Sequence, residues 1–112
     1  MNTTAAALQA IFNRIPRRHS LENVKDIYSL LDEYEDLLIS IEATNSFYEK
    51  NIPVYFDELE NIRSVIKKST DNKASKKMKD SLFDEGSGNL KDGMQKLMEI
   101  YGDGSRTAWN HP

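Results

Sequence analysis

The sequence predicts an all-α protein, either a small helical bundle or an antiparallel coiled-coil hairpin with short flanking helices. A seven-residue repeat runs in register from Val24 to Ile66, and an apolar stripe of this kind is stable only when another helix covers it. No segment alternates apolar and polar residues between turn signals, as a half-buried strand would. The composition, with 38% hydrophobic and 29% charged residues, is typical of a thin helical bundle.

The first predicted helix begins near Thr3 or Thr4, either of which can cap it, and ends before Pro16, which cannot continue a helix. Residues 1–19 contain arginines but no acid, a composition that also resembles a mitochondrial targeting segment. We favour a short helix that covers the end of a bundle, because its apolar residues share one face. These residues are Leu8, Ile11, Phe12 and Ile15.

Ser20 is predicted to cap a long second helix over about residues 20–50. Thr44 and Asn45 are weak helix formers, but the heptad phase continues across them, which favours helix. Pro53 is expected in the first turn of a further helix over residues 54–68, since a proline in a helix interior costs about 3 kcal/mol. The break at residues 51–53 leaves two arrangements open, an antiparallel hairpin and a kinked continuous rod.

Residues 69–76 are predicted to form an exposed, flexible loop, and Gly86-Ser87-Gly88 a flexible linker, with a turn or two of helix between them. A last helix is expected to begin near Asn89 and to end before Gly102. The chain is therefore predicted to form a single helical domain over residues 1–102 and a mobile tail over residues 103–112.

Charge is strongly segregated along the chain, although the net charge is only −3. Residues 20–62 contain eleven acidic and two basic side chains, whereas residues 63–80 contain seven basic and two acidic ones. The absence of cysteine rules out a disulfide framework and a thiolate zinc site, and no apolar run approaches the ~18 residues of a membrane span. We expect a cytoplasmic protein without membrane insertion, with a mitochondrial location as the alternative.

Few residues suggest enzyme chemistry. Arg14 and His19 have a spacing similar to that in helical ribonucleases that use an arginine and a histidine at a dimer interface, but Pro16 breaks the helix that would hold them together. Two histidines and no cysteine provide no metal-ligand spacing, and Gly86 and Gly88 lack the preceding strand of a phosphate loop. We therefore expect a non-enzymatic protein with no cofactor, no metal and no small-molecule substrate.

The favoured function is that of a protein–protein interaction module, such as a subunit, an adaptor or a small inhibitor, that acts through its apolar heptad face. A single amide in such a stripe selects one register or partner number, and tyrosine hydroxyls are readily satisfied at an interface. The partner is another protein or a second copy, in a hetero-complex or a dimer. The residues assigned to this face are Tyr34, Leu38, Ile41, Asn45, Tyr48, Ile52 and Tyr55.

The alternative is a small nucleic-acid-associated regulator that uses the basic segment 63–79. Its lysines suit phosphate groups, yet no aromatic residue is interleaved with them for stacking on bases. The same side chains suit an acidic protein partner equally well. The residues assigned to this contact are Arg63, Lys67, Lys68, Lys73, Lys76 and Lys77.

Overall fold

The structure is a computed structural model that describes residues 3–16 and 18–101. Within these residues the chain forms five α-helices and no strand: α1 (Thr3–Asn13), α2 (Leu21–Glu42), α3 (Ser46–Asn51), α4 (Pro53–Lys68) and α5 (Lys76–Tyr101). The prediction of an all-α small helical bundle is confirmed. None of these helices is both long and apolar enough to cross a lipid bilayer. The predicted tail over residues 103–112 lies outside the described residues.

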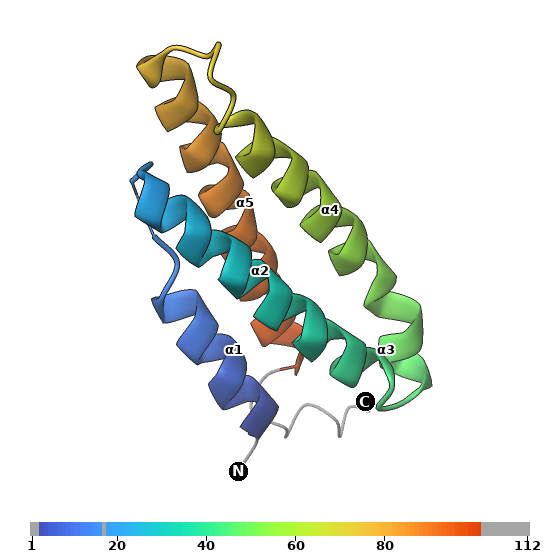
Figure 1. The fold of residues 1–112 in the computed structure, drawn as a ribbon. Helices are drawn as coiled ribbons and strands as arrows, with labels where there is room; N and C mark the ends of the chain where they lie inside the picture. Colours follow the sequence, from blue (N-terminus) through green and yellow to red (C-terminus); the bar gives the residue numbers. More distant parts are fainter. Residues whose placement is uncertain (1–2, 17, 102–112) are drawn as a thin grey trace.

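Four of the helices pack side by side in alternating directions, so that α1 is antiparallel to α2, α2 to α4 and α4 to α5 (Figure 1). Both α1 and α4 contact α2 and α5, which closes the four helices around one core. The short α3 forms the corner between α2 and α4. Because α1 has 11 residues and α2 has 22, α1 covers only part of the length of the bundle.

The apolar stripe of the sequence supplies most of the core. All of its aliphatic members on α2 and α4 are buried, and α1 and α5 add their own apolar residues to the same cluster. Complete burial of one such side chain contributes about 1.5–3 kcal/mol, so this cluster is the main source of stability. Its members with no exposed surface are Leu8, Ile27, Leu31, Leu38, Ile52, Ile66, Phe83, Leu90, Met94 and Leu97.

The helix α2 begins as predicted but ends earlier. The Ser20 Oγ accepts a hydrogen bond from the Asn23 N–H at 3.0 Å and caps the helix. The predicted continuation to residue 50 is wrong, because α2 ends at Glu42 and the chain reverses direction at residues 43–45 (Figure 1). Of the two arrangements that the sequence left open, α2 and α4 adopt the antiparallel one.

Asn45 is the N-cap of α3 and not a member of a continuous helical stripe. Its backbone is extended, and its Oδ1 accepts a hydrogen bond from the Tyr48 N–H at 3.1 Å. The heptad spacing survives the turn because α3 and α4 return along the same core. Tyr48 and Ile52 therefore keep the spacing of the repeat, although the helix is interrupted, and both are buried in the core of the bundle.

The predicted break near Pro53 is confirmed. Ile52 alone separates α3 from α4, and Pro53 lies in the first turn of α4, where a missing N–H costs nothing. The segment after α4 connects it to α5 without forming a helix of its own, in agreement with the predicted loop. Ser69 is the exception to the predicted exposure: it is fully buried, and its Oγ donates to the Ile66 carbonyl.

The predicted linker at Gly86-Ser87-Gly88 is wrong, as is the predicted helix start near Asn89, because α5 runs without interruption from Lys76 to Tyr101. Glycine in a helix interior costs up to about 1 kcal/mol relative to alanine, which is why the segment resembles a linker. The structure gives Gly86 a packing role, since a Cβ there would lie 2.5 Å from the Ile66 Cδ1. A side chain at this position would force the buried Ile66 to shift.

Candidate functional site

Most of the residues assigned from the sequence to a partner-binding apolar face lie inside the bundle. Asn45 is exposed but caps α3. The other six are at most 8% exposed and belong to one buried cluster: Tyr34, Leu38, Ile41, Tyr48, Ile52 and Tyr55. In this fold the stripe packs against the chain's own helices, so it does not offer a partner a continuous apolar surface.

Two of the buried tyrosines have perturbed hydroxyl groups. Burial raises the pKa of Tyr34 far above its ordinary value, and the neighbouring Tyr55 and Glu58 add to the effect. Burial also raises the pKa of Tyr55, which lies near Glu58 and Glu99. Among the described residues the Tyr34 hydroxyl has no hydrogen-bond partner. Both phenols stay neutral at physiological pH and act as core residues.

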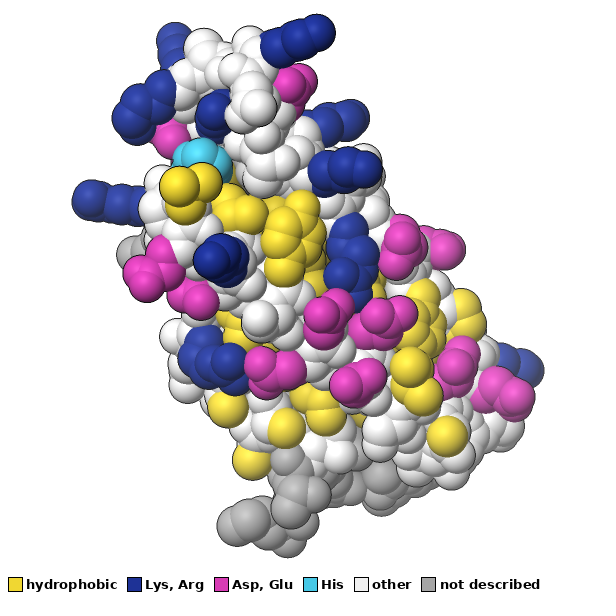
Figure 2. Space-filling view, viewed as in Figure 1, with side chains coloured by type: hydrophobic (Ala, Val, Ile, Leu, Met, Phe, Trp, Pro, Cys, Tyr) yellow, Lys and Arg dark blue, Asp and Glu magenta, His cyan; other side chains and the backbone are white. Residues whose placement is uncertain are grey.

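Basic side chains gather at one end of the bundle, where α4 ends and α5 begins, whereas acidic side chains lie along its middle (Figure 2). We call this the lysine-rich end. Its members from the predicted basic segment are exposed: Lys67, Lys68, Lys73, Lys76 and Lys77. The fold thus brings together, at a single end, five of the six residues that the sequence assigned to a polyanion or an acidic partner.

Most of these ammonium groups have no carboxylate partner within residues 3–16 and 18–101. Lys76 is the exception, with its Nζ 3.0 Å from the Asp80 Oδ2, but an exposed pair one turn apart contributes only about 0.3–0.5 kcal/mol. With the described residues, none of the other four forms an ion pair: Lys67, Lys68, Lys73 and Lys77. Uncompensated charges of one sign produce a positive potential that attracts anionic groups.

Arg63 does not belong to this surface, although the sequence grouped it with the lysines. Its guanidinium extends from α4 to α2, with Nη2 at 3.0 Å from the Glu35 Oε1 and Nη1 at 3.2 Å from the Asp32 Oδ1. Its Nε also lies 3.6 Å from the Glu60 Oε2 on the same helix. Three carboxylates thus surround one guanidinium, and Arg63 links two helices instead of facing a polyanion.

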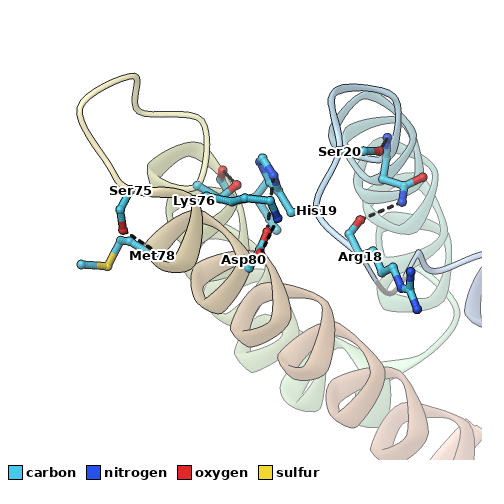
Figure 3. A network of polar contacts seen from close by, with 10 residues as sticks. Arg18, His19, Ser20, Ser75, Lys76, Met78 and Asp80 are labelled. Atoms are coloured by element: carbon cyan, nitrogen blue, oxygen red, sulfur yellow. Dashed lines mark hydrogen bonds and ion pairs between the residues drawn. The ribbon is translucent and has the colours of Figure 1, made fainter.

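The loop between α1 and α2 joins the lysine-rich end, which sequence reasoning missed. The His19 ring packs edge-on against Phe83, with centroids 5.7 Å apart, and its Nδ1 is 3.9 Å from the Asp80 Oδ1 (Figure 3). These contacts pack the loop between α1 and α2 against α5. No sequence signal links His19 to Phe83 and Asp80, because only the packing of this loop on α5 brings them together.

Arg14 and His19, which the sequence suggested as a weak catalytic pair, make separate contacts. The Arg14 Nη1 and Nη2 each donate a hydrogen bond to the Glu33 carboxylate at 3.0 Å. This hydrogen bonding raises the pKa of Arg14 and lowers the pKa of Glu33. Because Arg14 contacts α2 and His19 contacts α5, the two side chains do not form a joint site in this fold.

The described surface has shallow hollows. The hollow between α4 and α5 is polar, and the hollow beside the Arg14–Glu33 pair includes Asp26 and Ser29. Neither hollow contains a histidine to activate a nucleophile. Among the residues with described positions, no three His, Asp or Glu side chains come together as a metal-binding group. The α4–α5 hollow is lined by Glu58, Asn61, Ile62, Asn89, Asp92, Gly93 and Lys96.

Comparisons of the chain with protein-family models, with curated proteins and with solved structures found no match. The functional argument therefore rests on the arrangement of this chain's own side chains.

Proposed function

We propose that this protein is a non-enzymatic protein–protein interaction module, such as an adaptor, a subunit or a small inhibitor, that docks on an acidic surface of its partner through the lysine-rich end. The observation that carries the proposal is the group formed by Lys67, Lys68, Lys73 and Lys77, which are exposed and lack ion-pair partners among the described residues. An acidic partner is attracted to this end and repelled by the acidic middle, which sets the orientation of docking.

This proposal moves the contact away from the apolar heptad face. The stripe is buried in the core of the bundle, so a partner would reach it only if the helices separated. Lys67 and Lys68 lie in the last turn of α4, where a cation interacts favourably with the helix dipole. Lys73 and Lys77, by contrast, contribute little to the fold, because long exposed side chains without partners add almost nothing to stability. Their concentration at one end is better explained by a contact with another molecule.

The alternative function, a nucleic-acid-associated regulator, would use the same lysines for phosphate contacts. Two observations favour a protein partner instead. Phe83, the aromatic residue that follows the lysines in α5, is fully buried and cannot stack on bases. The acidic side chains along the middle of the bundle (Figure 2) would repel a long phosphate backbone that extends past the end.

The test compares two charge-matched double variants of the full chain. Lys73→Gln with Lys77→Gln removes two charges from the lysine-rich end, and Lys50→Gln with Lys96→Gln removes two exposed lysines from elsewhere. Binding to fluorescein-labelled poly-L-glutamate and to a labelled DNA duplex is measured by fluorescence anisotropy over a range of salt concentrations. Circular dichroism verifies the fold of each variant.

We expect the first double variant to bind polyglutamate about tenfold more weakly than the wild type, and the second to bind like the wild type. An equal loss in both variants would mean that only net charge matters and would refute a docking surface. Tighter binding of the duplex than of polyglutamate, lost in the first variant, would favour the nucleic-acid alternative.

A further inference from the structure

The lysine-rich end contains an exposed apolar side chain, Met78, in the first turn of α5. Met78 is 54% exposed although it is a large hydrophobic residue. Its position is well defined, because its N–H donates to the Ser75 Oγ at 3.1 Å in the cap of the helix. Its side chain projects from the side of α5 that faces away from His19 (Figure 3).

Met78 is the outer end of an apolar row on α5. Residues four apart lie on one face of a helix, so Met78, Leu82 and Gly86 follow one another along α5. Leu82 is half-buried, and Gly86 lies against Ile66 and Val65 of α4. The row therefore leads from the solvent into the contact between α4 and α5, and Met78 with Leu82 forms a small apolar platform on a rigid support.

Lysines flank Met78 in the sequence, whereas the exposed Glu85 adds a carboxylate one turn beyond Leu82 on the same face of α5. Lys77 precedes Met78 and Lys79 follows it, and Lys73 lies at the end of the preceding loop. An apolar centre with a charged rim is typical of a protein-recognition surface, in which the apolar contact supplies most of the affinity and the rim supplies specificity. Methionine suits such a centre, because its flexible thioether adapts to side chains of different shape.

We propose that the lysine-rich end recognises a short acidic segment of a partner protein that carries an apolar side chain. The apolar side chain packs on Met78 and Leu82, while the flanking carboxylates meet the lysines. This inference rests on the proposed function and adds the chemistry of the partner. A polyanion without apolar groups, such as a nucleic acid, would use the lysines but leave Met78 exposed. A membrane surface would require a much broader apolar face than one methionine and one half-buried leucine.

The experiment uses two short labelled peptides of Asp and Glu, one with a central leucine and one with serine in its place. Their affinities for the full chain are measured by fluorescence anisotropy for the wild type, Met78→Gln and Met78→Leu. The matched control is Val54→Gln, because Val54 is also 54% exposed but lies at the start of α4, at the opposite end of the bundle (Figure 1). Circular dichroism verifies that every variant is folded.

We expect the wild type to bind the leucine peptide about tenfold more tightly than the serine peptide, which corresponds to one good apolar contact. Met78→Gln should abolish this difference, whereas Met78→Leu and Val54→Gln should preserve it. Equal affinities of the wild type for both peptides, or a difference that survives Met78→Gln, would overturn the inference.

The failure of this inference is distinguishable from the failure of the proposed function. If both peptides bind equally and both lose affinity in the Lys73→Gln and Lys77→Gln variant, the result supports docking on an acidic partner and refutes the apolar contact with Met78. If neither peptide binds at low salt, both proposals are wrong. Binding to anionic vesicles that exceeds binding to the leucine peptide and is lost in Met78→Gln would overturn the protein partner in favour of a membrane surface.

Discussion

Ile66 of α4 occupies the space that a side chain on Gly86 of α5 would need, with its Cδ1 2.5 Å and its Cγ1 3.0 Å from the position of a Cβ on Gly86. Ile66 is fully buried, so it cannot move aside without disturbing the packing around it. Gly86→Ala is therefore expected to lower the free energy of unfolding by about 1–3 kcal/mol.

Gly88 provides the control for this prediction. Apart from the neighbouring residues and the backbone of its own helix, no atom of the described residues lies within 4 Å of a Cβ at Gly88. Gly88→Ala should therefore raise the free energy of unfolding by up to about 1 kcal/mol through helix propensity alone. Urea unfolding followed by circular dichroism compares the two variants. Equal stabilisation by both substitutions would contradict the close contact between α4 and α5.

Replacement of Asn45 by leucine should destabilise the protein, whereas the heptad pattern predicts a gain of stability. A leucine in a buried apolar seam would stabilise the protein, whereas loss of the hydrogen bond from the Tyr48 N–H to the Asn45 Oδ1 should cost about 1 kcal/mol. We expect Asn45→Leu to lower the melting temperature and Asn45→Asp, which keeps the cap, to restore most of it. A higher melting temperature for Asn45→Leu would favour the uninterrupted helix.

A comparison of two leucines of α2 isolates the effect of burial on stability, because the residue type is the same and only the exposure differs. Leu38 has no exposed surface, whereas Leu21 is 86% exposed. Leu38→Ala should cost about 2–5 kcal/mol of unfolding free energy because it leaves a cavity in the core, while Leu21→Ala should change it by less than about 0.5 kcal/mol. Thermal melts of both variants test this contrast, and a neutral Leu38→Ala would show that the stripe is not buried in the isolated chain.

The buried Tyr34 should make the protein sensitive to alkaline pH. Burial raises the pKa of its hydroxyl above the ordinary value of 10.0, so the folded chain retains this proton to a higher pH than the unfolded chain. The associated stability is fully present below about pH 10 and is lost as the pH rises from there through the folded-state pKa.

Tyr34→Phe should weaken this loss of stability above about pH 10. Near neutral pH it should change the unfolding free energy by less than about 1 kcal/mol, because the hydroxyl has no hydrogen-bond partner to lose among the described residues. Urea unfolding at neutral and alkaline pH measures both effects. Tyr28→Phe, at a half-buried position of the same helix, is the control for the loss of one hydroxyl near neutral pH. An unchanged alkaline slope in Tyr34→Phe would refute the assignment.

The features that the sequence predicted correctly depend on neighbouring residues. The Ser20 cap and the position of Pro53 each involve residues within one helical turn, and such interactions are visible in the sequence. The heptad repeat also extends to Tyr48 and Ile52, beyond a turn that it did not reveal, and both are buried in the core of the chain instead of on the predicted partner-binding face. A repeat records which side of the chain faces the core, not whether the helix that carries it is continuous.

Contacts between distant segments decided the remaining features. Gly86 is a helix breaker by its own propensity, but the approach of Ile66 makes glycine the residue that fits within α5. The sequence grouped Arg63 with the lysines, but in the fold its charge is neutralised by ion pairs with three carboxylates. The loop between α1 and α2 packs on α5 through the contact of His19 with Phe83. Local propensity and periodicity determined the all-α class, the starts of α2 and α4 and the apolar stripe. Helix continuity at residues 43–45 and 86–88 and the surface available to a partner depended on how the helices pack, because packing determines which close contacts form, which charges are neutralised and which stay exposed.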